Sequence, residues 1–134
     1  MIITSLGGLP AFAAYFIAAA LLCVAFAVSY TAITPNNELE LIRAGNTAAA
    51  LEVGMSLIGF SIPLASAIYH AGSLVDCLIW GVVALIAQLA AYLLARGAHR
   101  NLPASIAKNE TASGVFVGCV SLTAGILSAA CMSY

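Results

Sequence analysis

Residues 34–69 read TPNNELELIRAGNTAAALEVGMSLIGFSIPLASAIY, a turn followed by a short charged segment and a long apolar segment. The turn contains Pro35, the charged segment covers Glu38–Arg43, and the apolar segment follows Gly45 and Asn46. A proline ends a preceding helix, and an apolar run of about 20 residues is long enough to cross a bilayer as a helix. The stretch therefore predicts a short helix in the membrane interface that leads into a membrane-spanning helix.

The composition extends this interpretation to the whole chain. Hydrophobic residues make up 63% of the 134 residues and charged residues 7%, whereas about a quarter of a soluble domain is charged. Four apolar runs reach spanning length, at residues 9–33, 47–69, 77–98 and 111–133, and they lack the apolar–polar alternation of a membrane β-barrel. We predict an all-α polytopic membrane protein in which residues 1–134 form a single domain of four transmembrane helices.

The basic residues predict the orientation. All four lie in, or at the edges of, the first and third connections between the apolar runs, at Arg43, Arg96, Arg100 and Lys108. The connection at residues 70–76 and both termini have none. By the positive-inside rule the basic loops face the cytoplasm and both termini face the periplasm. Tyr30 is expected at the cytoplasmic interface.

Polar and small residues recur along the second apolar run at steps of three and four, which places them on one helix face. A carboxylate in a membrane helix costs at least ~2.5 kcal/mol, so it is a functional candidate. Three interpretations stay open: the carboxylate reaches the cytoplasmic headgroups or pairs with Arg96 or Lys108, lines a proton or cation path, or contacts another protomer. The candidate stripe is Glu52, Ser56, Gly59, Pro63 and Ser66.

Small residues also predict where helices pack, because they let backbones approach closely in lipid. The fourth apolar run contains a literal GxxxG followed by further small residues, and Gln88 near the middle of the third run is expected to hydrogen-bond across helices. The predicted packing residues are Gly54, Gln88, Gly114, Gly118, Ser121 and Gly125.

The two halves of the chain resemble each other. Aligning Ile42 with Ile106 pairs IRAGNTAAALEVG with IAKNETASGVFVG without a gap, and matches Gly54 with Gly118. This predicts two copies of a helical hairpin, residues 9–69 and 77–134, in the same orientation. The face that carries Ala50, Gly54 and Ser61 is then expected to pack as its equivalent does.

The sequence offers little chemistry. It has no nucleotide-binding, hydrolase or metalloprotease motif, its two histidines are predicted on opposite sides of the membrane, and its basic residues are too few for nucleic acid. A disulfide between Cys77 and Cys131 is one interpretation, and buried free thiols are the favoured one. We expect no enzyme activity, no cofactor, no metal and no nucleic-acid partner.

The run ITPNNELELIRAGNTAAA, the later IGFSIPLASA, the WGVVALIAQL segment and the terminal SAACMSY together resemble the YjfL family of small bacterial inner-membrane proteins, a domain of unknown function. The resemblance covers nearly the whole chain. It implies a four-helix inner-membrane protein built from a duplicated hairpin, with a role in envelope stress or maintenance. Residues that match its pattern include Pro63, Gln88 and Thr111; in the cytoplasmic loop the candidate residues are Asn37, Glu38, Arg43, Asn46 and Thr47.

Two functions follow as hypotheses. The first is a structural or interaction protein that contacts the lipid bilayer, itself as a homo-oligomer, and possibly another envelope protein. The alternative is an oligomeric ion or small-solute channel lined by the second helix and its candidate stripe.

Overall fold

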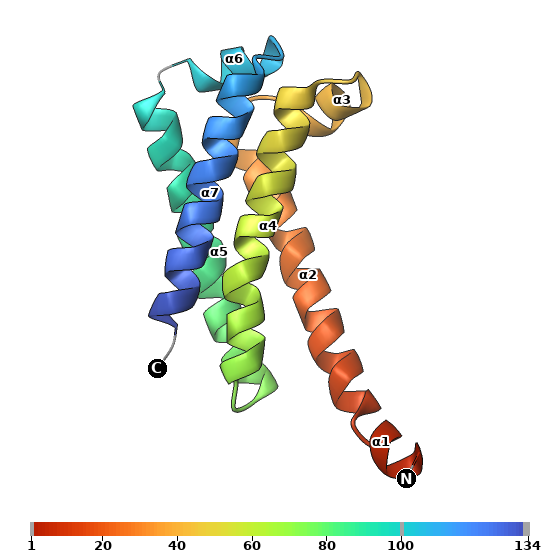
Figure 1. The fold of residues 1–134 in the computed structure, drawn as a ribbon. Coiled ribbons are helices and arrows are strands. Elements are labelled where there is room, and N and C mark those ends of the chain that lie inside the picture. Colours follow the sequence, from red (N-terminus) through yellow and green to blue (C-terminus); the bar gives the residue numbers. More distant parts are fainter. Residues whose placement is uncertain (1, 100, 133–134) are drawn as a thin grey trace.

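The protein is all-helical. The computed structural model describes residues 2–99 and 101–132, and four helices in them are long and apolar enough to cross a membrane. Two short helices, α3 and α6, each connect two of the long ones (Figure 1). The elements are α1 (Ile2–Leu6), α2 (Leu9–Ile33), α3 (Glu38–Arg43), α4 (Thr47–His70), α5 (Leu74–Ala98), α6 (Leu102–Ala107) and α7 (Thr111–Cys131).

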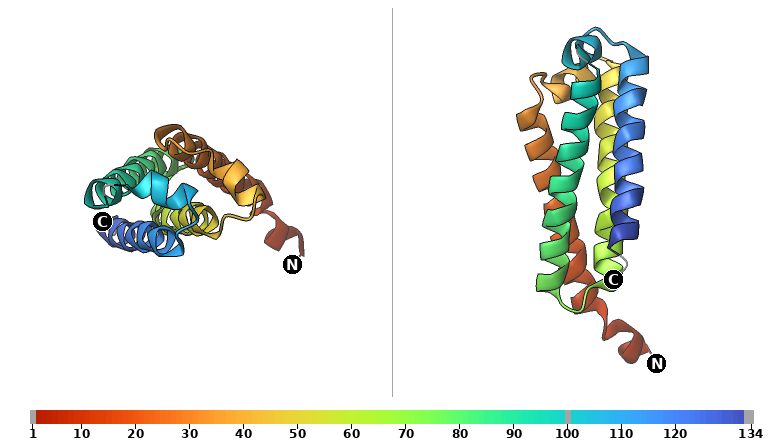
Figure 2. Two further views of the ribbon diagram at one scale, coloured as in Figure 1. Left: turned by 90° about the horizontal axis from the view of Figure 1, so that it is seen from above. Right: turned by 90° about the vertical axis from the view of Figure 1, so that its left-hand side faces the viewer.

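The long helices run side by side and place the connections at two ends of the bundle. Helices α3 and α6 lie together at one end, and both ends of the chain lie at the other, beside the connection from α4 to α5 (Figures 1 and 2). We refer to these as the α3–α6 end and the terminal end. An even number of spans accounts for both termini lying on one side.

Helix α4 is the centre of the bundle because it packs against α2, α5 and α7. Helix α2 is more peripheral and buries only a row of residues spaced by four. Its N-terminal part and α1 extend beyond the other helices at the terminal end (Figure 1). The buried row of α2 is Ala18, Leu22, Phe26 and Tyr30.

Local sequence signals set the helix boundaries. Helix α4 begins after Asn46, whose side chain caps it, and α5 begins after Ser73, whose hydroxyl accepts from the backbone N–H of Asp76 at 3.2 Å. That cap starts α5 three residues before the predicted residue 77. Helix α7 ends at Cys131, and the predicted end at residue 133 lies outside the described residues.

The two halves of the chain have the same order of elements: a long helix, a six-residue helix and a second long helix. In both halves the short helix is followed by a residue with a left-handed backbone, Gly45 with φ 87° and Asn109 with φ 61°. These two residues are aligned in the sequence comparison of the halves. The sequence interpretation missed α6 as a helix, although its own alignment places α6 opposite α3.

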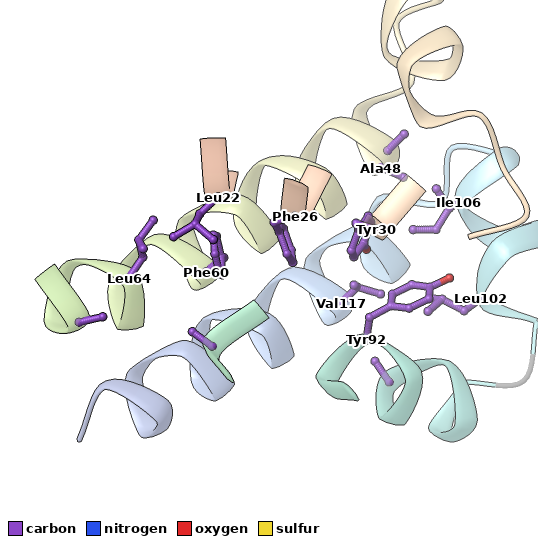
Figure 3. Close-up of a cluster of buried hydrophobic side chains, with 14 of the residues drawn as sticks. Leu22, Phe26, Tyr30, Ala48, Phe60, Leu64, Tyr92, Leu102, Ile106 and Val117 are labelled. Atoms are coloured by element: carbon purple, nitrogen blue, oxygen red, sulfur yellow. The ribbon is translucent and has the colours of Figure 1, made fainter. Parts of the chain in front are cut away.

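Aromatic side chains fill the space between α2, α4 and α5 (Figure 3). The rings of Phe26 and Phe60 stack with centroids 4.9 Å apart, and Tyr30 meets Tyr92 edge-on at 4.9 Å. Such pairs contribute about 0.5–1.5 kcal/mol beyond the area they bury. They hold α2 to the bundle near the α3–α6 end, where α2 is most buried.

Helices α4 and α7 approach so closely that three positions of α7 have no room for a side chain. A Cβ on Gly114 would collide with the backbone oxygen of Ala48, a Cβ on Gly118 with Met55, and a Cβ on Gly125 with the backbone oxygen of Gly59. Backbone atoms cannot rotate away as a side chain can. This pair of helices therefore depends on glycine in α7.

The close approach predicts the effect of one added methyl group. We expect Gly125→Ala to lower the free energy of unfolding by about 1–3 kcal/mol, because the methyl group forces α4 and α7 apart. The measurement is unfolding in detergent micelles by titration with a denaturing detergent, followed by circular dichroism.

Gly97→Ala is the matched control, because a Cβ there meets nothing within 4 Å. We expect it to be neutral or stabilising by up to ~1 kcal/mol, from the better helix propensity of alanine. Equal effects of the two variants would contradict the account of the α4–α7 contact.

Candidate functional site

The polar residues predicted as a stripe on α4 lie inside the bundle. Ser56 Oγ and Ser121 Oγ, from α4 and α7, are 3.0 Å apart and share a hydrogen bond. The Gln88 amide, from α5, donates to the backbone oxygen of Ser121 at 3.2 Å. The three helices are thus joined by hydrogen bonds at mid-bundle. The side-chain oxygen of Gln88 is buried there without a hydrogen-bond partner.

The rest of the stripe follows the same contact with α7. Gly59 and Pro63 are buried, and Ser66 is half-buried with its hydroxyl donating to the backbone oxygen of Ala129 at 3.4 Å. A single chain therefore encloses the candidate stripe between its own helices.

Glu52 is 2% exposed and does not reach the membrane surface. Its Oε1 accepts a hydrogen bond from the Tyr30 hydroxyl of α2 at 2.9 Å. The expected partners Arg96 and Lys108 were wrong; Arg96 instead directs its Nη1 toward the backbone oxygen of Ile33, at 3.5 Å. Glu52 is therefore buried inside the bundle, where α2 packs against α4.

Glu38, the first residue of α3, is also buried. Asn37 caps α3 by accepting from the backbone N–H of Glu40 at 3.4 Å, and this turn directs the Glu38 side chain inward, where it is 1% exposed. Neither of its carboxyl oxygens has a hydrogen-bond partner. The sequence predicted an interfacial helix here but not a buried acid.

Tyr30 and Tyr92 complete this acidic region. The sequence placed Tyr30 at the membrane interface, but the structure buries it against Tyr92 (Figure 3). Tyr92 was not singled out for this role. The available signal was a phenol and a carboxylate at the same depth on neighbouring helices, since a buried carboxylate needs a donor. We call Tyr30, Glu38, Glu52 and Tyr92 the acid cluster.

The two connections at the α3–α6 end are fastened to each other by asparagines. Asn46 accepts from the backbone N–H of Ala49, at 2.8 Å, and donates to the backbone oxygen of Ile106, also at 2.8 Å. In the opposite direction, the side-chain oxygen of Asn109 accepts a hydrogen bond from the backbone N–H of Ala48 at 3.1 Å. The start of α4 is therefore held by the segment that follows α6. Asn109 was not predicted.

Several predicted residues lie outside these contacts. Thr47 and Arg43 are exposed. Gly54 is also exposed, and a Cβ on it would meet nothing within 4 Å. Its expected packing role is therefore absent within one chain, although its aligned residue Gly118 packs tightly. The reason is that α7 packs against α4 through the face that contains Gly118, whereas α4 packs against α7 through a face that does not contain Gly54.

The histidines, cysteines and acids are candidate metal ligands and reactive groups. In residues 2–99 and 101–132 no three His, Cys, Asp or Glu side chains are grouped so that they could hold a metal. All four cysteines are free, with Cys77 buried and Cys131 exposed. His99 Nε2 lies 3.1 Å from the hydroxyl of Ser113, which links α5 to α7. The basic residue Arg100 lies outside the described residues.

Comparison with known proteins agrees with the predicted resemblance. A family model described as "Domain of Unknown Function (DUF350)" matches residues 4–132. The chain is 40% identical over 129 residues to the "UPF0719 inner membrane protein YjfL" of Escherichia coli K12. The aligned residues cover 96% of this chain and 98% of the relative. The protein of that name from E. coli O157:H7 matches to the same extent. No solved structure matches.

The asparagine contacts predict a difference between two caps. We expect Asn46→Ala to lower the free energy of unfolding by about 1–2 kcal/mol, because it removes the cap of α4 and leaves the oxygen of Ile106 without its donor. Asn37→Ala, which removes only the cap of the short α3, is expected to cost less. Denaturing-detergent titrations measure both, and a larger loss for Asn37→Ala would contradict the proposed fastening.

Proposed function

The chain belongs to the DUF350 family, and from this premise we propose that it is a structural or interaction protein that assembles as a homo-oligomer in the bacterial inner membrane. Its relative is an inner-membrane protein, and the chain itself has four candidate spans. The short connections leave little mass outside the bilayer. Its large lipid-facing surface is therefore the main surface that the protein can offer to a partner.

The internal repeat supports this proposal. The order of elements, the lengths of α3 and α6 and the left-handed residues Gly45 and Asn109 all correspond between the halves. We infer that the chain is a duplicated hairpin with both copies in one orientation. Corresponding faces of α4 and α7 then descend from one ancestral face.

The observation that carries the proposal is that these corresponding faces are used differently. The α7 face with Gly114, Gly118 and Gly125 is covered by α4. The corresponding α4 face, with Ala50, Gly54 and Ser61, is exposed in the single chain. Apolar burial does not drive association in lipid, but small residues favour it by permitting close packing and hydrogen bonds. We propose that a helix of a second copy covers this α4 face.

We also propose an orientation of the chain in the membrane and a role in the cell envelope. Arg43, Arg96 and Lys108 lie at the α3–α6 end, so this end faces the cytoplasm by the positive-inside rule and both termini face the periplasm. We propose a role in envelope maintenance or stress, in which another envelope protein can bind the oligomer. The proposal assigns no reaction to the chain.

A channel lined by α4 receives less support. Its expected lining residues Glu52, Ser56 and Gly59 are enclosed within one chain. Ser56 and Gly59 lie against α7, so water would reach these two residues if α4 separated from α7, and the close contact at Gly114 and Gly125 opposes that separation. The channel hypothesis is tested by ion flux into proteoliposomes, for which the interaction hypothesis predicts no flux above empty vesicles.

The exposed α4 face predicts the effect of a bulky residue. We expect Gly54→Leu to raise the dissociation constant of the oligomer about tenfold, ~1.4 kcal/mol, because the side chain holds the second copy away. Open space around Gly54 means that the single chain still folds. Single-molecule photobleaching in lipid vesicles at several protein-to-lipid ratios measures the association.

Gly97→Leu is the matched control, an exposed helical glycine with nothing within 4 Å of an added Cβ. It is expected to leave the association unchanged. A wild-type chain that is monomeric at every ratio, or equal effects of the two variants, would contradict the proposed interface.

A further inference from the structure

The contact between α4 and α7 joins the two copies of the repeated hairpin through different faces of corresponding helices. The pairs in closest contact are Gly114 with Ala48, Gly118 with Met55, and Gly125 with Gly59. We call the α4 side of this contact, with Ala48, Met55 and Gly59, the leading face of α4. The α7 side, with its three glycines, is the trailing face of α7.

The repeat gives each of these faces a counterpart on the other helix. In the alignment of Ile42 with Ile106, the trailing face of α7 corresponds to the trailing face of α4, which contains Ala50, Gly54 and Ser61. The leading face of α4 corresponds to the leading face of α7, which contains Ala112, Cys119 and Thr123. Both counterpart faces are exposed in the single chain. One chain therefore covers one leading face and one trailing face and leaves the other face of each kind uncovered.

The uncovered leading face of α7 is also one wall of an apolar groove between α7 and α5. Cys119 and Thr123 line a hollow of about 400 Å³ in this groove, and a second hollow of about 250 Å³ lies further along the same two helices. The corresponding position on α4 is filled within the chain, since a Cβ on Gly59 would meet Ser121 of α7 and Gln88 of α5. The groove adjoins the α4–α7 contact, because α7 belongs to both. It therefore marks the place where the repeat lacks its next neighbour.

We propose that copies of the chain associate head to tail, with the leading face of α7 in one copy packed against the trailing face of α4 in the next. This inference rests on the proposed homo-oligomer and identifies the surface that covers Gly54. Gly54 then lies beside Cys119 of the neighbouring copy, as Gly118 lies beside Met55 within one chain. A contact between two different faces repeats from copy to copy, so the assembly closes into a ring or extends as a filament.

The contact between copies is expected to be wider than the contact within one chain. Ser61 and Thr123 stand where the contact within the chain has two glycines, and larger side chains hold helix axes further apart. The residue aligned with Asn46 is Glu110, and a carboxylate cannot donate to a backbone oxygen as the amide of Asn46 does. The copies therefore separate more readily than α4 and α7 do.

Disulfide cross-linking of the full-length chain in lipid vesicles tests this arrangement. The variant carries Gly54→Cys and keeps the native Cys119, while alanine replaces the other three cysteines. A Cβ on Gly54 has open space in the single chain, so the variant still folds. Thiols whose Cβ atoms lie about 3.5–4.5 Å apart form a disulfide when copper phenanthroline is added as the oxidant. We expect cross-linked species larger than a dimer on denaturing gels, because each chain carries one cysteine on each of the two faces.

Two controls identify the residues that react. Adding Cys119→Ala to the variant is expected to abolish the cross-linked species, because it removes the thiol of the leading face. Gly97→Cys in place of Gly54→Cys, at another exposed helical glycine with open space around it, is expected to give no cross-link to Cys119.

A symmetric contact between two Gly54 faces would overturn the head-to-tail arrangement. It would give a cross-linked dimer and nothing larger, and this dimer would persist after Cys119→Ala. The absence of any cross-link in vesicles where photobleaching shows the variant to be oligomeric would overturn the arrangement as well. In both cases the proposed homo-oligomer itself stands. A chain that is monomeric by photobleaching would instead contradict the proposed function, and the head-to-tail arrangement with it.

Discussion

The contact between the backbones of α4 and α7 is the constraint on which the other features of the structure depend. Gly125 lies against the backbone of Gly59, and Gly114 lies against that of Ala48. At this separation only small residues fit, so Ser56 and Gly59 of α4 are enclosed instead of exposed. The same contact determines which face of α4 remains outside, and hence where a second copy can pack.

The acid cluster depends indirectly on the contact between α4 and α7. Because α7 occupies one side of α4, helix α2 packs on another side and brings Tyr30 to Glu52. Helix α3 packs against α4, and its Asn37 cap directs Glu38 into the bundle. Two acids fourteen positions apart in the sequence, Glu38 and Glu52, are thus both buried.

Most of the fold could be predicted from the sequence, because the bilayer imposes a length and an apolar character that are easily recognised. Caps such as Asn46 and the glycines of α7 also carry local signals. The partner of Glu52 could not be predicted, since the rotation of α2 about its axis depends on tertiary packing. The stripe on α4 was visible as a helix face, but its period does not show whether the face meets water, lipid or another helix.

The role of Gly54 shows the same limit of sequence interpretation. Its alignment with Gly118 predicted a packing role for both residues, but in the single chain only Gly118 is covered by another helix, and Gly54 is exposed. A structure determined in lipid nanodiscs tests the central claim most directly. The account predicts a helix of a second copy over Ala50, Gly54 and Ser61. It also predicts that the candidate stripe, from Glu52 to Ser66, is dry inside each chain. Lipid alone over the face with Gly54, together with water along the candidate stripe, would contradict the account.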